Sequence, residues 1–287
     1  MNVLSRITGV SVATLGAFLF LGAPAQAHHF EKQFPITNKP VITVRNPSGN
    51  IQVKAWNKPE VMITTEFASD KLQIAAEQAG DRIEVETQVT GDNPSADELK
   101  ADYVVSVPEE SELQVRTDSG DVTVDSVHGN MTFDTVGANL QLSDVEGYVV
   151  IKSIDGSLVC TRCAGSLDAT SISGNFQLIQ PAMDSVRVQT SSGNILFDGN
   201  FIRRGIYILK NYSGTIEVRF SPSDSFDVTA NSLYGKVLNQ APVKPDVHGK
   251  TQPPHYSNAF VGGSVNQGNA KVELSSFSGT IKILKRD

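Results

Sequence analysis

Residues 120–173 read GDVTVDSVH GNMTFDTVG ANLQLSDVE GYVVIKSID GSLVCTRCA GSLDATSIS, six nine-residue segments with no gap between them. Each segment follows the pattern G-x-h-x-h-x-x-h-x, in which h is a mostly apolar residue and Ala138 is the one exception to the leading glycine. A short regular period indicates a repeat architecture, because one such unit can bury its apolar side chains only against its neighbours.

A longer period lies over the first one. Turns resembling T-x-S-G recur at steps of 18 to 21 residues, at Gly120, Ala138, Gly156, Gly174, Gly193, Gly214 and Gly235. Gly279 follows 44 residues later, which fits one further coil after a Pro-rich insertion at residues 239–260. The spacing predicts a coil of about 18–21 residues built from two similar halves.

The apolar positions predict strands that stack in register. Positions 3 and 5 of each segment alternate with polar residues, as a half-buried strand requires, and position 8 is apolar again after a corner. We expect position 8 to point inward, with Gly or Ser at the boundary allowing the turn. The sequence therefore predicts an all-β fold, a parallel β-solenoid. Its two facing ladders are Val122, Leu140, Leu158 and Phe176, and Met131, Val149 and Leu167.

The N-terminal third is less regular. Residues 48–56, SGNIQVKAW, carry the same signature and predict the first rung, whereas residues 57–110 contain strand-like runs joined by turns. We interpret them as an antiparallel β cap, since an open solenoid end exposes unpaired backbone groups. The predicted divisions are an N-terminal β region and cap at 28–110 and solenoid repeats at 111–287.

Residues 1–27 resemble a secretory signal peptide. Arg6 precedes an apolar stretch, and AQA at 25–27 is a small-x-small cleavage site before His28. We therefore expect an exported protein, periplasmic or at the cell surface, with no transmembrane segment in the mature chain. Without Arg6 the chain has 23 basic and 31 acidic residues, and this acidic balance argues against nucleic acid as a partner.

The repeats resemble a known bacterial family. The stretch VPEESELQVRTDSGDVTVDSVHGNMTFDT, the later S-G turns and NPSGNIQVKAW near the start are similar to the "putative adhesin" β-strand-repeat family, also called toastrack domains. The resemblance covers nearly all of the mature chain. It implies a stacked parallel β fold and an exported or envelope-associated protein, and it brings no catalytic motif to this sequence.

Both cysteines lie in one C-x-x-C. Cys160 occupies position 5 and Cys163 position 8 of their segment, where neighbouring segments have Val, Leu or Ile. A redox couple needs a helix N-terminus to lower the thiol pKa, and a structural zinc site needs four ligands. We expect either two small buried side chains or a disulfide across the corner, and export to an oxidising compartment favours the disulfide.

Aromatic residues gather late in the sequence. Tyr212 and Phe277 lie two residues before their glycines, in the column of Ile154 and Ile172, so we expect them in the core. Tyr234 directly precedes Gly235 and is expected to point outward. Together with Tyr256 in the Pro-rich insertion, it is the candidate contact surface, because insertions on solenoids often lie on the binding face.

These observations favour an exported, non-catalytic envelope or adhesin-like binding module whose partner is a glycan or an envelope protein. We predict no catalytic residues, cofactor or metal site. Two alternatives stay open. One is an envelope-stress regulatory module. The other is a polysaccharide-active enzyme, which would need clustered carboxylates that the repeat does not place on one face.

Overall fold

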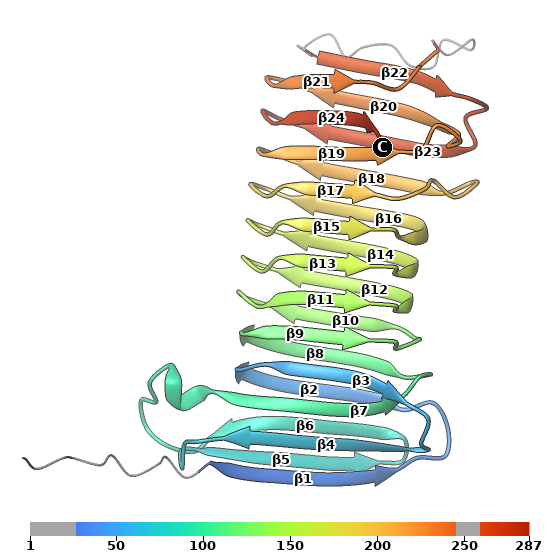
Figure 1. Ribbon diagram of the computed structural model, residues 1–287. Coiled ribbons are helices and arrows are strands. Elements are labelled where there is room, and N and C mark those ends of the chain that lie inside the picture. The colour runs from blue at the N-terminus through green and yellow to red at the C-terminus, as the bar shows by residue number, and fades with distance from the viewer. Residues whose placement is uncertain (1–26, 245–258, 287) are drawn as a thin grey trace, which may run out of the picture.

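The computed structural model describes residues 27–244 and 259–286, which form two large sheets around one core (Figure 1). The predicted all-β, mostly parallel solenoid is confirmed. Sheet A contains, in spatial order, β1 (His28–Pro35), β4 (Glu60–Phe67), β7 (Ala101–Pro108), β3 (Ile51–Trp56), β9 (Asp121–Asp125), β11 (Asn139–Ser143), β13 (Leu158–Thr161), β15 (Phe176–Ile179), β17 (Ile195–Asp198), β19 (Thr215–Phe220), β24 (Thr280–Lys285) and β21 (Lys236–Asn239).

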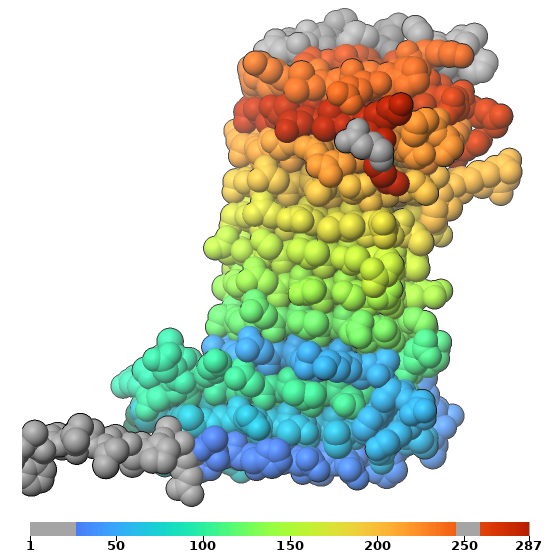
Figure 2. Space-filling view, viewed as in Figure 1, coloured from blue at the N-terminus to red at the C-terminus, as the bar shows by residue number. Residues whose placement is uncertain are grey.

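Sheet B faces sheet A across the core. In spatial order it contains β22 (Ala259–Val265), β20 (Phe226–Ser232), β23 (Ala270–Ser276), β18 (Ile206–Asn211), β16 (Ala182–Thr190), β14 (Ala164–Ser171), β12 (Glu146–Ser153), β10 (Met131–Thr135), β8 (Glu112–Ser119), β2 (Val41–Ser48), β6 (Arg82–Val89) and β5 (Leu72–Ala79). A 3-10 turn, η1 (Asp97–Leu99), precedes β7. Within the described ranges no helix is long and apolar enough to cross a membrane. Figure 2 shows a straight column that broadens at its N-terminal end.

The two predicted ladders are present. Val122, Leu140, Leu158 and Phe176 pair in register across sheet A, and Met131, Val149 and Leu167 do so across sheet B. All seven side chains are at most 3% exposed. Because the register between coils is maintained, like positions stack on like positions, and each apolar row is buried between the two sheets.

The N-terminal end contains the antiparallel pairs that the sequence indicated. β1 pairs with β4, β4 with β7 and β5 with β6, all antiparallel. Parallel pairs of β7 with β3 and of β6 with β2 then join this region to the first rung. The cap and the solenoid share both sheets, so the division at residue 110 stays a prediction. The predicted signal peptide lies outside the described residues, apart from Ala27.

At the C-terminal end the spatial order differs from the order along the chain. The sequence suggested a last coil added after an insertion, but β23 lies between β18 and β20, and β24 between β19 and β21. The last coil is therefore inserted beneath the one that precedes it in sequence. Residues 245–258 of the predicted insertion lie outside the described residues. On either side of them, Lys244 forms an isolated antiparallel β-bridge with Ser264, and β22 pairs antiparallel with β20.

The nine-residue repeat contains two different corners. Where the chain passes from sheet A to sheet B, position 7 has a positive φ, as at Asp144 (53°) and Arg162 (53°), and position 8 points into the core. Val127, Val145 and Cys163 are the buried position-8 residues of these inward corners. A non-glycine residue takes the left-handed conformation at a cost of roughly 1–3 kcal/mol, which the packing around it must offset.

Where the chain passes from sheet B to sheet A, the arrangement is reversed. At several of these corners position 7 is a Ser or Thr whose side-chain oxygen accepts a hydrogen bond from the N–H of the glycine three residues later, as Ser171 Oγ does from Gly174 N (2.9 Å). Thr135, which precedes Ala138, has no such bond among the described residues. Position 8 then points into solvent. Val136, Ile154 and Ile172 are 45%, 50% and 57% exposed, so the expectation that position 8 is always inward is wrong for these outward corners.

The glycine of the outward corner allows two coils to approach closely. A Cβ on Gly174 would collide with the carbonyl oxygen of Gly156, one coil away, and a Cβ on Gly193 would collide with that of Gly174. These two positions therefore have no room for a side chain. Glycine is required there by the close approach of the coils and not by backbone conformation, since neither Gly174 nor Gly193 has a positive φ.

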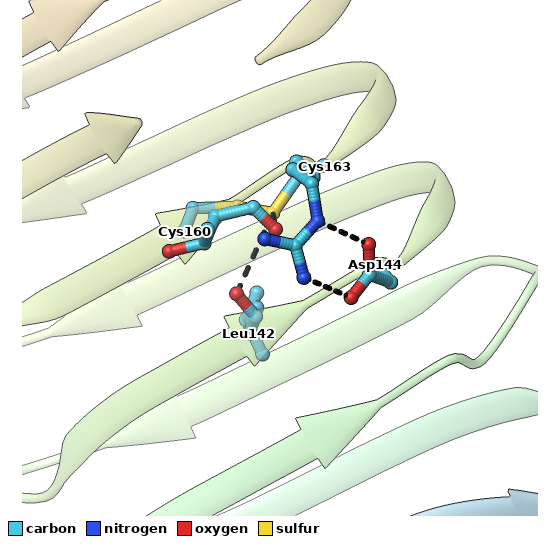
Figure 3. Close-up of a disulfide and its surroundings, with 6 residues drawn as sticks. Leu142, Asp144, Cys160 and Cys163 are labelled. Atoms are coloured by element: carbon cyan, nitrogen blue, oxygen red, sulfur yellow. Dashed lines mark hydrogen bonds and ion pairs between the residues drawn. A yellow bond between two sulfur atoms is a disulfide. The ribbon is translucent and has the colours of Figure 1, made fainter. Parts of the chain in front are cut away.

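The inward corner also brings the two cysteines together. Cys160 and Cys163 are fully buried, their Cα atoms are 6.0 Å apart, and the structure joins their sulfur atoms in a disulfide (Figure 3). Beside them, Arg162 Nε donates to Asp144 Oδ1 of the previous coil (2.7 Å) and lowers the pKa of that carboxyl group. Oxidation of the pair in the mature protein stays a prediction.

We predict that Gly174→Ala lowers the free energy of unfolding by about 2 kcal/mol or more, because the added methyl group must force two coils apart. Gly137→Ala is the matched control at a neighbouring corner, since its Cβ would meet nothing closer than 3.7 Å. Urea unfolding followed by circular dichroism measures both. Equal stability of the two variants would contradict the close approach of the coils.

We predict that the protein purified from its oxidising compartment has no free thiol. Intact-mass analysis after alkylation without reductant should show no added label, and labelling should appear only after reduction and unfolding because both sulfur atoms are buried. Two labelled cysteines in the unreduced, unfolded protein would contradict the disulfide.

The two corners make a further prediction about where a C-x-x-C can close. In a Cys160→Val/Cys163→Val background, Leu142→Cys/Val145→Cys should form a disulfide because both positions are buried at an inward corner. Ile151→Cys/Ile154→Cys should stay reduced, because position 154 points into solvent. Thiol counting after air oxidation distinguishes the two pairs. Efficient closure of the second pair would overturn the distinction between the corners.

Candidate functional site

The aromatic residues singled out in the sequence differ from one another in their exposure and in whether the structure describes them. Tyr234 is 65% exposed, and Tyr256 lies outside the described residues. The expectation that Tyr212 and Phe277 belong to the core is wrong, since they are 57% and 37% exposed. Both occupy position 8 of outward corners, where the buried residue is the one before them, Asn211 or Ser276.

These exposed residues form one cluster, which we call the aromatic corner: Tyr212, Phe277 and Tyr234. The rings of Tyr212 and Phe277 stack with centroids 4.4 Å apart and planes 9° apart. Tyr234 meets Phe277 edge-on at 5.0 Å. The cluster lies on the left edge of the column in Figure 1, where β18, β23 and β20 turn into sheet A.

The insertion of the last coil creates this cluster. Tyr212 and Phe277 are distant in sequence, and they stack because β23 pairs directly with β18. Tyr234 reaches Phe277 because β20 pairs with the other edge of β23. Neighbouring strands are about 4.8 Å apart, which is close to the separation of stacked rings. The sheet therefore sets the spacing of the aromatic corner.

A groove of about 470 Å³ lies beside the aromatic corner on the outer face of sheet B. Tyr212, Leu233 and Phe277 line one side of it. The other side is a row of polar side chains in register across four strands, Gln189, Lys210, Ser275 and Asn231. We call this row the polar row and the space between it and the aromatic corner the corner groove.

The corner groove has little net charge. Lys210 Nζ, the charged group of the polar row, forms an ion pair with Glu273 Oε1 at 3.1 Å. Asn231 Oδ1 and Asn211 Oδ1 are buried without a hydrogen-bond partner among the described residues. An unpaired buried carbonyl oxygen is costly, and both of these oxygens are inaccessible from the groove.

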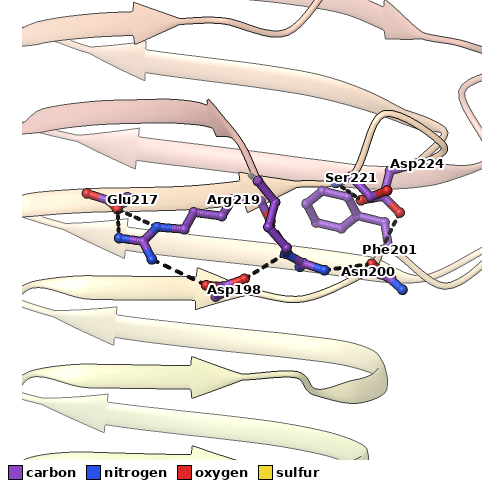
Figure 4. Close-up of polar contacts among 8 residues, drawn as sticks. Asp198, Asn200, Phe201, Glu217, Arg219, Ser221 and Asp224 are labelled. Atoms are coloured by element: carbon purple, nitrogen blue, oxygen red, sulfur yellow. Dashed lines mark hydrogen bonds and ion pairs between the residues drawn. The ribbon is translucent and has the colours of Figure 1, made fainter.

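The strongest charge cluster lies elsewhere, on sheet A. Arg219 Nε donates to Glu217 Oε1 at 2.8 Å, and Arg286 Nε donates to Asp198 Oδ1 at 2.8 Å (Figure 4). The hydrogen bond that Arg219 donates to Glu217 raises the pKa of Arg219. Each carboxylate of the cluster has an arginine partner, and the network joins β17, β19 and the segment after β24. Its evident role is to hold the inserted coil in place.

The other shifted pKa values also have structural causes. Burial raises the pKa of Tyr103 and of Tyr207 to about 12. The Tyr207 hydroxyl accepts from Ile202 N and donates to the Met183 carbonyl oxygen, both at 2.8 Å, and so braces a loop. In the described part of the chain no three His, Cys, Asp or Glu side chains are grouped so as to hold a metal ion.

Sequence reasoning missed the aromatic corner although a signal for it was present. Position 7 of the repeat differs between the two kinds of corner. It is Ser or Thr at outward corners (Thr135, Ser153, Ser171), and it is Asp, Arg or Ser with a positive φ at inward corners. Position 7 together with position 8 predicts that Phe277 points outward, because Ser276 precedes it, whereas Asn211 before Tyr212 belongs to neither set. The contact between Tyr212 and Phe277 had no local signal, because it depends on the strand order.

A comparison with the curated proteins found no match. Among solved structures, a "putative adhesin" from Bacteroides fragilis is 10% identical, with 90% of this chain and 97% of that chain covered and a TM-score of 0.47. A "putative cell adhesion protein" from Clostridium sporogenes is 12% identical, with 91% and 100% covered and a TM-score of 0.32. Likenesses this distant say nothing about what this chain binds.

A family model also matches most of the chain. The Toastrack DUF4097 family matches residues 40–284, from β2 to the last residues of β24, and so includes both the first rung and the inserted coil. The stacked parallel coils and the two mostly parallel sheets agree with this match. The chain belongs to the Toastrack DUF4097 family.

Proposed function

We propose that the protein is an exported, non-catalytic binding module of the cell envelope and that the aromatic corner is its contact surface. The observation that carries the proposal is the stack of Tyr212 and Phe277, two large apolar side chains held in solvent. Exposed apolar patches on soluble proteins commonly mark interaction sites, and aromatic residues dominate the energetics of such surfaces.

The solenoid makes the aromatic corner suitable for binding because it is rigid. Tyr212 and Phe277 lie directly after β18 and β23, and Tyr234 lies two residues after β20; each of these strands is hydrogen-bonded on both sides. Little conformational entropy is therefore lost when a partner covers the rings, and pre-organisation of this kind raises affinity. A row of exposed apolar residues at outward corners, Val136, Ile154 and Ile172, extends the same edge of the column.

Export is supported by residues 1–27 and by the place where the first strand begins. β1 starts at His28, directly after the proposed cleavage site. The ring of His28 stacks on Phe67 at 5.2 Å, and its Nε2 lies 2.8 Å from Asp70 Oδ1. Cleavage before His28 would therefore leave β1 complete.

We predict that purified mature protein, residues 28–287, co-sediments with cell envelopes of the organism that produces it. Tyr212→Ser/Phe277→Ser/Tyr234→Ser should reduce the bound fraction about tenfold or more, since each lost aromatic contact is worth roughly 0.5–1.5 kcal/mol. Tyr148→Ser, at a tyrosine 48% exposed on β12, is the matched control and should bind normally. Normal binding of the triple variant, with an unchanged unfolding curve, would refute the proposed contact surface.

We predict that the protein recovered from its host begins at His28. N-terminal sequencing or intact-mass analysis of the envelope or secreted fraction measures this directly. Recovery of the full-length chain from the cytoplasm alone would refute export.

A further inference from the structure

The column of outward side chains at position 8 has a gap directly below the aromatic corner. Going up the edge, the column contains Ile172, Ser191, Tyr212 and Phe277, because β14, β16, β18 and β23 are consecutive neighbours in sheet B. The side chain of Ser191 is too short to fill its place. Two strand spacings, about 9.5 Å, separate Ile172 from Tyr212, which leaves room for one flat ring between them.

The gap is apolar above and below. One face of Tyr212 is covered by Phe277, and the opposite face looks toward the level of Ser191. Tyr212 is 57% exposed, so much of this ring is accessible to a ligand, and Ile172, also 57% exposed, forms the lower side. A ring placed midway would lie at nearly the distance at which Phe277 already stacks on Tyr212.

The rim of the gap is polar on both sides. The corner groove side carries Gln189 and Lys210 of the polar row. The other side carries Ser192 and Ser213, in a column of serines that precede the corner glycines. The hydroxyl of Ser191 forms the floor, and among the described residues neither it nor the Gln189 amide has a hydrogen-bond partner.

This pattern fits a pyranose ring better than it fits a protein side chain. A sugar presents C–H groups on its two faces and hydroxyl groups around its rim, whereas an inserted Phe or Leu would leave the polar rim unpaired. An extended peptide would need a free strand edge, and β16, β18 and β23 are each paired on both sides. Among the described residues that line the corner groove, the charged one, Lys210, is already paired with Glu273, and this favours a neutral sugar over an acidic one.

We propose that the protein binds neutral glycans at this site. One pyranose stacks on Tyr212 over Ser191, and the adjoining sugars extend along the corner groove, where Gln189, Lys210, Ser275 and Asn231 are available as hydrogen-bonding partners. This inference rests on the proposed function, since it assigns the ligand class of the same contact surface.

The sharpest test fills the gap from within the chain. Ser191→Tyr should place a ring between Ile172 and Tyr212, leave the fold intact and reduce glycan binding at least about tenfold. Asp118→Tyr makes the same change at the equivalent exposed position of another outward corner and should leave binding unchanged. Tyr212→Ala should also reduce binding. The probe is an array of neutral and acidic oligosaccharides incubated with residues 28–287.

Binding to neutral oligosaccharides that Ser191→Tyr abolishes and Asp118→Tyr preserves would support the inference. No binding to any neutral glycan, or equal binding by Ser191→Tyr and wild type, would overturn it. The envelope assay separates this outcome from failure of the proposed function. If periodate treatment of the envelopes removes binding, the glycan inference is supported. If protease treatment removes binding and periodate does not, the partner is a protein: the binding module stands and the glycan inference fails.

Discussion

At several outward corners a buried Ser or Thr hydroxyl accepts the N–H of the glycine three residues later, and that glycine lies against a carbonyl oxygen one coil away. Ser171 and Gly174 make this contact, and Thr190 with Gly193 and Ser276 with Gly279 repeat it. The hydroxyl must be inside to satisfy the buried N–H, so the next side chain must point out. Where it occurs, this hydrogen bond and the close approach of the glycine hold neighbouring coils together, and the residue after the hydroxyl points outward along one edge of the molecule.

Most of the fold could be predicted from the sequence because the repeat is local. The ladder of Val122, Leu140, Leu158 and Phe176 follows from a period of nine residues, and the structure has it in register. The outward direction of Ile172 could not be read from hydrophobicity, since it follows from the preceding Ser171, whose hydroxyl lies inside and accepts the N–H of Gly174. The position of the last coil was also out of reach, because each coil has nearly the same pattern and no local signal specifies which neighbour it selects.

The candidate site depends on both of these unpredicted features. The outward corner exposes Tyr212 and Phe277, and the strand order brings them into contact. The position of Tyr234 before Gly235 predicts that its side chain points outward. Its contact with Phe277 was not predicted, because Phe277 was expected in the core. The surface is thus a product of tertiary arrangement laid on a regular scaffold, which is how solenoids commonly acquire binding sites without altering their core.

The strand order also has a consequence for how the molecule is made. Up to β19, each coil can pair with the coil made before it as the chain emerges. The strands β20 and β21 are synthesised before β23 and β24. In the folded protein, however, β23 lies between β18 and β20, and β24 lies between β19 and β21. The coil formed by β23 and β24 is therefore expected to pair last, between strands that were synthesised before it. A chain cut short before residue 270 would leave the edges of β18 to β21 without their partners, open to pairing with other chains.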